Sequence, residues 1–229
     1  MTQTPHTKWL ISIEQWSAWQ FNPLTQELPD ISFIDVSLRR KLSLLAKMSL
    51  KVAHDCASNY TNVRMVFASR HGDLAKTTQM LTNLAMNEAP SPTAFSMSVL
   101  NASAGVYSIT KKDTAPSVAV SASESSFGFG LLEAHLQLAS DPSVPVLFVY
   151  ADEMPPELYE VNEASFTPHA IGLLLTNNAP LKVECELSDA NYPTSLAPQS
   201  IAFLECLNNR HAVSWCDNGK LWNWQHATN

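Results

Sequence analysis

The stretch Ser91–Glu133, SPTAFSMSVLNASAGVYSITKKDTAPSVAVSASESSFGFGLLE, decides the fold class of this chain. It predicts a short buried strand at Ser117–Ala122, a sharp turn of small residues, and a helix over Phe127–Ala139. A strand–turn–helix of this kind often presents a nucleophile, because the unpaired amides at the helix N-terminus stabilise a thiolate. No cysteine occurs in the stretch, and the residue at the tip of the turn is Ser123 or Glu124.

The rest of the chain alternates between apolar runs and helical periodicity. The predicted strands are Trp9–Trp19, Val63–Ser69, Val144–Tyr150, Ala170–Thr176 and Leu181–Leu187, and the predicted helices are Ser37–Ser58, Leu74–Met86 and Ile201–Asn208. Strands that alternate with helices predict an α/β layered domain with a mixed, mostly parallel sheet between helices. We find no internal repeat and no linker, so residues 1–229 are predicted to form a single domain.

The composition excludes several classes of protein. The chain has 229 residues, 45% of them hydrophobic, and a formal net charge of −7. Nucleic-acid binding is not expected, since it needs clustered Lys and Arg. No apolar run approaches the roughly 20 residues of a membrane span. The first residues lack the pattern of a signal peptide, so the predicted location is the cytoplasm.

The cysteines and histidines are scattered. The cysteines are Cys56, Cys185, Cys206 and Cys216. No two of them form a CxxC pair, and their spacing fits neither a zinc ribbon nor a disulfide framework. The histidines show no HExxH or other ligand spacing. The sequence therefore predicts free thiols, no metal site and no cofactor.

A cluster of basic residues accompanies the predicted helix Ser37–Ser58. Its members are Arg39, Arg40, Lys41, Lys47 and Lys51. Such a face either docks an acidic carrier protein or is a solvated helix face, and the sequence leaves both interpretations open.

The residues at the turn allow two interpretations. In the first, Ser123 is a helix N-cap and Glu124 is a first-turn acid, each stabilising the helix by about 0.3–1 kcal/mol. In the second, Ser123 is a nucleophile, which requires a general base and an orienting acid. His71, His135 and His169 are all candidates for that base and none is marked out. The GxSxG pattern of hydrolases is absent.

Several short motifs in this region follow one another in a recognisable order. They are Ser91-Pro92, then Asn101, Ala104, Gly105, Ser108 and Ile109, then Ala115-Pro116-Ser117, and finally Ala122-Ser123-Glu124. The order resembles the β-ketoacyl synthases of the thiolase fold, which carry S-P-F-F-x-P, N-x-x-A-G-x-x-S-I, G-P-S and T-A-C. The cysteine of the last motif is the nucleophile of that family. Counting without a gap from Asn101, Gly105 or Pro116 puts this cysteine position on Glu124.

The resemblance covers residues 8–176 by order of elements and residues 91–133 by motif. Ketosynthases of this fold contain a second, similar half that supplies two histidines and a lysine for decarboxylation, and 229 residues leave no room for it. Among these proteins the chain most resembles the short chain-length-factor subunits of bacterial aryl polyene biosynthesis, a type II polyketide-like and fatty-acid-like pathway. The resemblance implies a non-catalytic partner of a full-length ketosynthase, which forms a heterodimer and meets the acyl carrier protein through that complex.

The resemblance also implies an interface. The strand Ser117–Ala122 would pair with its counterpart in the partner, and the loop Pro92–Val99 would reach toward the partner's acyl pocket. Ala94 stands where many ketosynthases place a bulky aromatic side chain, so a small residue there would leave room for a growing polyene. The predicted pocket and interface residues are Ala94, Phe95, Met97, Asn101, Ser117, Val118 and Val120. The alternative is that residues 94–99 belong to the chain's own core.

Two further functions remain open from the sequence. One is a stand-alone acyl hydrolase or acyltransferase that uses Ser123 as its nucleophile. The other is a homodimeric acyl-binding scaffold without chemistry of its own.

Overall fold

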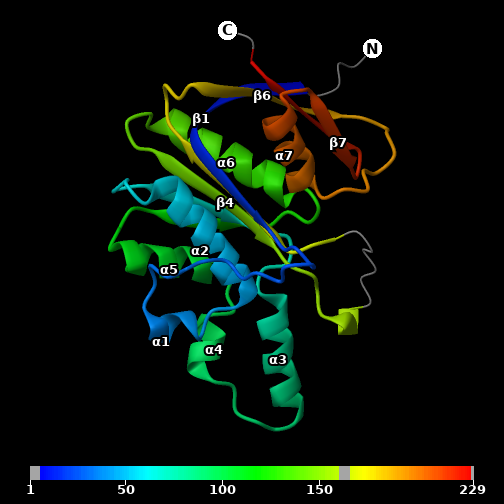
Figure 1. Cartoon of the computed structure of the whole chain (residues 1–229). Coiled ribbons are helices and arrows are strands. Elements are labelled where there is room, and N and C mark those ends of the chain that lie inside the picture. The colour runs from blue at the N-terminus through cyan, green and yellow to red at the C-terminus, as the bar shows by residue number, and fades with distance from the viewer. Residues whose placement is uncertain (1–5, 160–165, 228–229) are drawn as a thin grey trace.

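A computed structural model describes residues 6–159 and 166–227 (Figure 1). The strands are β1 His6–Gln20, β2 Arg64–Ala68, β3 Ser117–Val120, β4 Val146–Asp152, β5 His169–Leu175, β6 Leu181–Asp189, β7 Val213–Asp217 and β8 Lys220–His226. The helices are α1 Val36–Arg39, α2 Leu44–Ala57, α3 Leu74–Ala85, α4 Pro92–Ser96, α5 Ala102–Lys111, α6 Ser126–Ser140, α7 Gln199–Asn209 and the 3-10 turn η1 Glu157–Tyr159.

The strands form one mixed sheet in the order β3-β2-β4-β5-β1-β6-β8-β7. This confirms the predicted α/β class with a mixed sheet. The prediction that the sheet is mostly parallel is wrong, because only the pairs β2–β3 and β2–β4 are parallel and the other pairs are antiparallel. An apolar run indicates a strand buried on both faces but does not reveal its direction.

Helices cover both faces of the sheet, as predicted. Helices α2 and α5 pack on one face, over a core that contains Met48, Phe67 and Leu147. Helices α6 and α7 pack on the other face, where Phe127 and Trp222 are fully buried. The sheet is thus the middle layer between two separate hydrophobic clusters.

Helix α6 lies very close to the sheet. A Cβ atom at Gly130 would lie 2.7 Å from the Cβ of Ala68 and 2.8 Å from the ring of Phe148. Such contacts are too short for a side chain, so glycine permits the close approach. This agrees with the small residues that the sequence places at the start of the helix.

Three helical segments differ from the sequence prediction. The predicted helix Ser37–Ser58 is split into α1 and α2, because Ser43 caps a new helix by accepting a hydrogen bond from the amide of Ala46. The predicted loop Pro92–Val99 contains the single-turn helix α4. Helix α5 was not predicted at all.

The C-terminal hairpin β7–β8 was also missed, although the sequence carries its signal. Asn218 and Gly219 join the two strands and have φ values of 47° and 73°. An Asn-Gly pair with both φ angles positive is the preferred two-residue hairpin turn. The hairpin places Trp222 and Trp224 in the core beneath α6 and α7.

Helices α3 and α4 lie together at the lower end of the molecule in Figure 1, away from the hairpin. Helix α3 begins where predicted, with Asp73 accepting a hydrogen bond from the amide of Lys76. It contains no buried residue. Over the described residues, no helix is long and apolar enough to cross a membrane. The four cysteines are buried and free, as the sequence predicts for core thiols.

Candidate functional site

The predicted turn lies between β3 and α6, at the carboxyl end of the parallel strands. Ser123 is exposed and has a φ angle of 52°, in the left-handed region that non-glycine residues rarely adopt. The hydroxyl of Ser126 holds this conformation, since it donates to the carbonyl of Ser123 at 2.6 Å and accepts from the amide of Ala122 at 2.8 Å. Serine 126, rather than an external group, stabilises the turn.

The capping roles predicted for the turn are wrong. The N-cap position of α6 is Ser125, which makes no side-chain capping bond. Ser123 lies two residues earlier and Glu124 lies outside the first turn of the helix. The chain makes a tight left-handed turn before the helix begins, so neither side chain stands at the N-cap or in the first helical turn.

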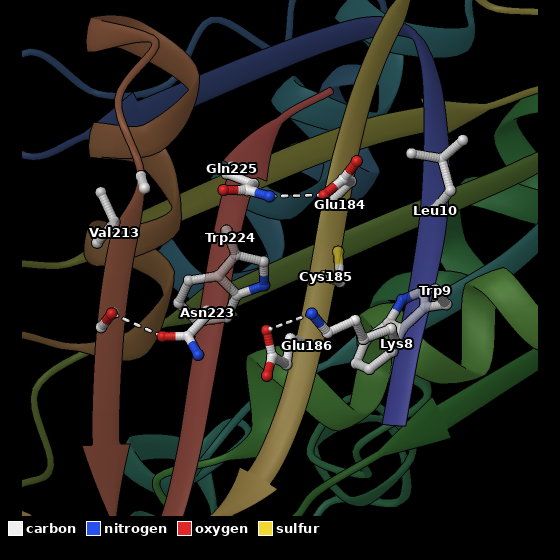
Figure 2. Close-up of a pocket in the computed structure, with 12 residues that line it drawn as sticks. Lys8, Trp9, Leu10, Glu184, Cys185, Glu186, Val213, Asn223, Trp224 and Gln225 are labelled. Carbon is white, nitrogen blue, oxygen red and sulfur yellow. Dashed lines mark hydrogen bonds and ion pairs between the residues drawn. The ribbon is translucent and has the colours of Figure 1, made fainter. Parts of the chain in front are cut away.

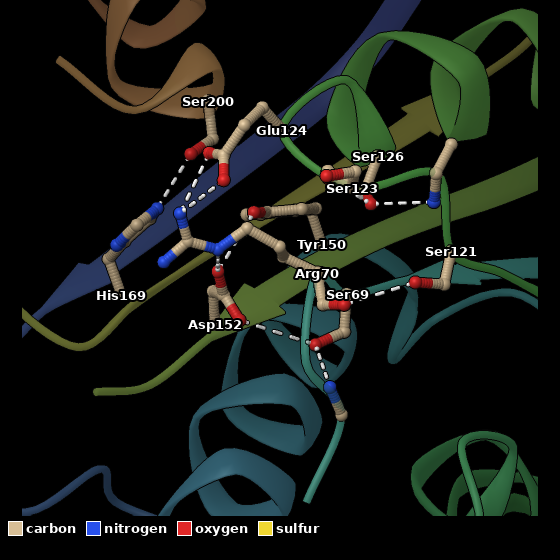
Figure 3. A network of polar contacts seen from close by, with 12 residues as sticks. Ser69, Arg70, Ser121, Ser123, Glu124, Ser126, Tyr150, Asp152, His169 and Ser200 are labelled. Carbon is tan, nitrogen blue, oxygen red and sulfur yellow. Dashed lines mark hydrogen bonds and ion pairs between the residues drawn. The ribbon is translucent and has the colours of Figure 1, made fainter. Parts of the chain in front are cut away.

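Glu124 instead forms an ion pair with Arg70 (Figure 3). The Nη1 atom of Arg70 donates to both carboxylate oxygens, at 2.9 Å to Oε1 and 2.7 Å to Oε2. Arg70 lies just after β2, separated from it by Ser69. Its side chain is only 7% exposed, whereas that of Glu124 is 42% exposed. The carboxylate at the tip of the turn is therefore fixed by a nearly buried guanidinium.

Arg70 also contacts a second carboxylate, that of Asp152 at the end of β4. Its Nε lies 3.3 Å from Oδ2 of Asp152, which is 1% exposed. The hydroxyl of Tyr150 donates to the same oxygen at 3.3 Å. Burial raises the pKa of Asp152 to about 7, although the charge of Arg70 acts in the opposite direction. The guanidinium additionally lies 5.6 Å from the ring centre of Phe166.

A buried serine–histidine pair lies beside this network. Nε2 of His169 is 2.6 Å from the hydroxyl of Ser200, and Nδ1 is 2.8 Å from the carbonyl of Thr167. Burial lowers the pKa of His169. Both His169 and Ser200 are almost fully buried, so a substrate cannot reach this serine without rearrangement.

None of the candidate bases is brought to Ser123. Within residues 6–159 and 166–227, no hydrogen bond joins a histidine to Ser123. His169 is occupied by Ser200, and the ring of His135 packs near Trp9. The described residues contain no group of three or more His, Cys, Asp or Glu side chains that could hold a metal ion.

The residues predicted for a partner interface lie around β3 and α4. Strand β3 is at the end of the sheet, with Ser117 exposed and Val118 and Val120 half-buried. In α4, Ala94 is half-buried and Phe95 is 63% exposed. Two more of the predicted residues flank these elements. Met97 is partly buried against the chain's own core, and Asn101 is exposed just before α5.

The sequence analysis missed the residues that hold Glu124 in place. Arg70 follows β2, whereas Tyr150 and Asp152 both belong to β4 much later in the chain, and no motif links the two segments. A usable signal was present, since Arg70 and Asp152 both stand where predicted buried strands end. Polar side chains at the carboxyl ends of neighbouring parallel strands meet at one edge of the sheet.

Away from this network, a hollow with a volume near 570 Å³ lies on the outer face of β1, β6, β8 and β7 (Figure 2). Its polar side chains pair with one another. Lys8 lies 3.4 Å from Glu186, Gln225 donates to Glu184 at 2.5 Å, and Ser214 donates to Asn223 at 2.6 Å. These pairs are typical of a solvated sheet face. We do not assign a function to this hollow.

Comparison with known proteins agrees with this geometry. Residues 14–225 match the family described as "Beta-ketoacyl synthase, N-terminal domain". The structure of the ketosynthase ApeO in complex with its chain length factor ApeC from Xenorhabdus doucetiae has a chain that is 27% identical, with a TM-score of 0.81 over 95% of this chain and 99% of that chain.

More distant structures share the fold alone. The ishigamide ketosynthase/chain length factor is 14% identical, with a TM-score of 0.55 over 73% of this chain and 62% of that chain. A β-ketoacyl synthase from Burkholderia phymatum is 13% identical, with a TM-score of 0.55 over 66% of this chain and 46% of that chain. No curated protein sequence matches the chain.

Proposed function

This chain belongs to the family of β-ketoacyl synthase N-terminal domains, and from that premise we propose that it is a non-catalytic, chain-length-factor-like partner of a full-length β-ketoacyl-ACP synthase. Across a heterodimer interface it would shape the acyl pocket of the active subunit. The resemblance in sequence supports aryl polyene biosynthesis as the pathway in which it would act.

The observation that carries the proposal is the position of Glu124 and its contact with Arg70. In the register implied by the ketosynthase motifs, Glu124 occupies the position of the nucleophilic cysteine. Its carboxylate is held by Arg70, at 2.7 Å and 2.9 Å. A carboxylate that accepts two charge-assisted hydrogen bonds from a guanidinium is a poor nucleophile, because the positive charge beside it balances its own. This contact supports a structural role for the turn and no part for it in condensation.

The free edge of β3 supports the pairing with a second subunit. The amides of Met65 in β2 and of Ser69 just after it donate to the carbonyls of Pro116 and Val120. Since the backbone groups of a parallel strand alternate in direction, those of Ser117 and Ala119 face away from β2. An unpaired row of this kind favours addition of another strand. The opposite edge differs, because Ser195 donates its amide to Cys216 of β7 at 2.8 Å.

Exposed apolar side chains support the same side of the molecule as the interface. Helices α3 to α5 and the turn after α3 carry Leu81, Leu84, Met86, Phe95 and Ile109, each at least 50% exposed. Soluble monomers rarely leave this much apolar surface on neighbouring elements. We infer that the ketosynthase covers these helices.

The similar complex supports a subunit of this length. The matched chain from the ApeO–ApeC structure is covered to 99%, so this chain corresponds to a whole chain of that complex and not to half of one. A short subunit that pairs with a complete ketosynthase agrees with this correspondence.

Reconstitution tests the proposal. The chain is co-expressed with the full-length ketosynthase of its pathway, and condensation of a starter with malonyl carrier protein is measured for each protein alone and for the pair. We expect no condensation by this chain alone and activity in the pair that is lost when the cysteine of the ketosynthase is replaced by alanine. Condensation by this chain alone would refute the proposal.

The hydrolase alternative has its own test, labelling with a serine-reactive fluorophosphonate. We expect no labelling, since the described residues provide no base for Ser123. Labelling that the Ser123→Ala variant abolishes would establish the serine as a nucleophile instead.

A further inference from the structure

Gly105 is a glycine that the chain's own structure does not require. It lies within α5 (Figure 1), is exposed, and does not have a positive φ angle. A Cβ atom at this position would meet no atom within 4 Å among the described residues outside its own stretch of helix. The other five glycines of the chain either have a positive φ or lie against atoms that a Cβ would touch: Gly72, Gly128, Gly130, Gly172 and Gly219.

This glycine weakens the helix in the isolated chain. A glycine in a helix interior loses more conformational freedom on folding than an alanine does, and it is less favourable there. Helix α5 has ten residues, and its N-cap residue Asn101 makes no side-chain capping bond, so capping does not compensate for the glycine. Since alanine would fit at position 105, the free chain gains nothing from glycine.

Gly105 lies at the centre of the exposed face of α5. Asn101 comes four residues before it and Ile109 four residues after it, so the three residues line one side of the helix. Asn101 is exposed as well, and Ile109 is 74% exposed. The buried residues of α5 lie on the opposite side and are Ser103, Ala104, Val106 and Tyr107. At Gly105 the backbone of α5 is therefore open to another chain, and two helices approach most closely where the side chains at the contact are smallest.

The surface around Gly105 is almost free of charge. Charged residues make up 15% of the chain, yet Glu88 is the only one between Lys76 and Lys111. This segment contains most of α3, all of α4 and most of α5, and Phe95 on α4 is 63% exposed. Depletion of charged residues together with aromatic side chains is typical of the core of a protein–protein interface. A partner that binds through its charges would meet a single charge here, that of Glu88.

The position of α5 indicates which partner covers this face. Helix α5 packs against β3, whose free edge is the proposed pairing edge for the ketosynthase. We propose that a helix of the ketosynthase crosses α5 at Gly105 in close backbone contact, so that glycine favours the complex at the expense of the free chain's stability. The inference rests on the proposed pairing with a ketosynthase and adds to it the contact that limits how closely the two subunits approach.

A single methyl group tests the inference. In the full chain, Gly105→Ala is expected to raise Tm by about 2–4 °C, measured by calorimetry, because alanine favours the helix and meets no neighbour. The same substitution is expected to weaken binding to the purified ketosynthase about tenfold, measured by biolayer interferometry, because the methyl group separates the two helices. Opposite effects on stability and affinity are not expected of a position outside an interface.

A larger side chain and a control complete the series. Gly105→Leu fills the same open space, so the isolated chain is expected to stay folded while its affinity for the ketosynthase falls about a hundredfold or more. The control is Asn208→Ala, at an exposed position of α7 on the other face of the sheet. It also replaces a poorer helix former with alanine, so we expect a smaller rise in Tm and a change in affinity of less than about twofold. Circular dichroism of each variant confirms that it is folded.

The outcomes separate this contact from the pairing itself. If the wild type binds the ketosynthase and Gly105→Leu binds it equally well, the crossing at Gly105 is refuted and the pairing stands. A lower Tm for Gly105→Ala would also refute it, since the chain itself would then need the glycine. If the wild type alone forms a homodimer that Gly105→Leu dissociates, a second copy of this chain occupies the face instead. No binding by the wild type would refute the proposed function, and this contact with it.

Discussion

Glu124 is a side chain whose neighbours decide its role. Its carboxylate contacts Arg70, which in turn contacts the buried Asp152, so three elements meet at one guanidinium. A cysteine at this position would leave Arg70 beside a thiol, and a glutamate gives it a fixed counter-charge. We infer that the substitution of cysteine by glutamate converts a reactive turn into a structural one.

This inference predicts a modest loss of stability when the carboxylate is removed. Glu124→Ala is expected to lower the free energy of unfolding by about 1 kcal/mol or less, because the side chain is 42% exposed and the pair is partly screened by solvent. In a chain of this size that corresponds to a decrease in Tm of about 2–4 °C, measured by calorimetry. Glu205→Ala, on the exposed side of α7, is the control and should leave Tm unchanged. Equal Tm values for all three proteins would contradict a structural role for Glu124.

The two acids at the carboxyl end of β4, Asp152 and Glu153, predict a pH dependence. Burial raises the pKa of both Asp152 and Glu153 to about 7 in the folded chain, above the values they have when unfolded. Between about pH 4 and pH 7 these two carboxyl groups therefore bind more protons in the folded state than in the unfolded state, and their contribution to stability falls as the pH rises through this window. Each group contributes at most about 1.4 kcal/mol per pH unit.

The matching measurement is thermal unfolding between pH 5 and pH 7.5, where the carboxylates with lowered pKa values stay ionised. Burial lowers the pKa of His54, His135 and His169, and these groups titrate in the same way in the wild type and in a variant at Asp152, so the difference between the two proteins reports on Asp152. Asp152→Asn carries no titrating proton, so its Tm should depend less steeply on pH than that of the wild type. Identical slopes for the two proteins would show that Asp152 is ionised throughout this range.

Sequence reasoning placed Glu124 at the tip of the turn because the motifs around it are local. It could not find Arg70 as the partner, since 54 residues separate the two and nothing in either motif connects them. The predicted capping roles failed for a related reason. The left-handed conformation of Ser123 depends on the hydroxyl of Ser126, and a helix pattern alone does not reveal where the first turn begins.

Strand β3 is the element that matters most for the proposed assembly. Its outward backbone groups belong to Ser117 and Ala119, and its inward groups bond to β2. The proposed heterodimer would use the outward row. A proline is tolerated on an edge strand when its missing N–H would have faced solvent.

Two proline variants separate the edge from the fold. Ala119→Pro removes an outward N–H, so we expect the isolated chain to remain folded and its affinity for the ketosynthase to fall about tenfold or more. Val118→Pro removes an inward N–H and is expected to destabilise the chain itself. Affinity is measured by biolayer interferometry with the purified ketosynthase. Wild-type affinity of the folded Ala119→Pro variant would exclude β3 from the interface.

Helix α4 makes a prediction about product length. Ala94→Phe places a large ring beside the exposed Phe95, and overfilling of a packed site typically costs about 1–3 kcal/mol. In the complex we expect the polyene products to become shorter, as measured by mass spectrometry of the released chains. The exposed Ser96→Ala in the same helix is the matched control, with unchanged products. Unchanged length for Ala94→Phe would remove this position from the pocket.

At the level of elements, strong hydrophobic periodicity predicted strands and helices correctly, and weak hydrophobic periodicity did not. The apolar strands and helices α3, α6 and α7 were predicted within a few residues of their observed ends. Helix α5 was missed because small residues such as Ser103 and Ala104 fill its buried positions, which leaves little apolar signal. The split between α1 and α2 was hidden, since Leu42 and Leu45 keep a helical spacing across it.

For the whole molecule, the fold class could be predicted from the alternation of strands and helices. The packing of the last hairpin against α6 could not. Trp222 and Trp224 from the last hairpin pack against Phe129 and Phe127 of α6. The local sequence pattern of α6 does not predict that a hairpin distant in the chain packs against it. Strand direction likewise depends on long-range connections, which explains the wrong expectation of a mostly parallel sheet.

The whole molecule also combines two unlike surfaces. The lower end in Figure 1 presents the exposed apolar side chains of α3 and α4, and the opposite end carries the hairpin. This asymmetry agrees with a subunit that is completed by a partner on one side only. The proposed heterodimer accounts for the free edge of β3, the exposed helices and the neutralised Glu124 together.

Native mass spectrometry of the chain co-expressed with the full-length ketosynthase of its pathway tests this account most directly. The account predicts a complex that contains the two proteins in equal numbers and is lost when Ala119→Pro is introduced. A spectrum in which this chain remains a monomer or a homodimer beside the free ketosynthase would contradict it.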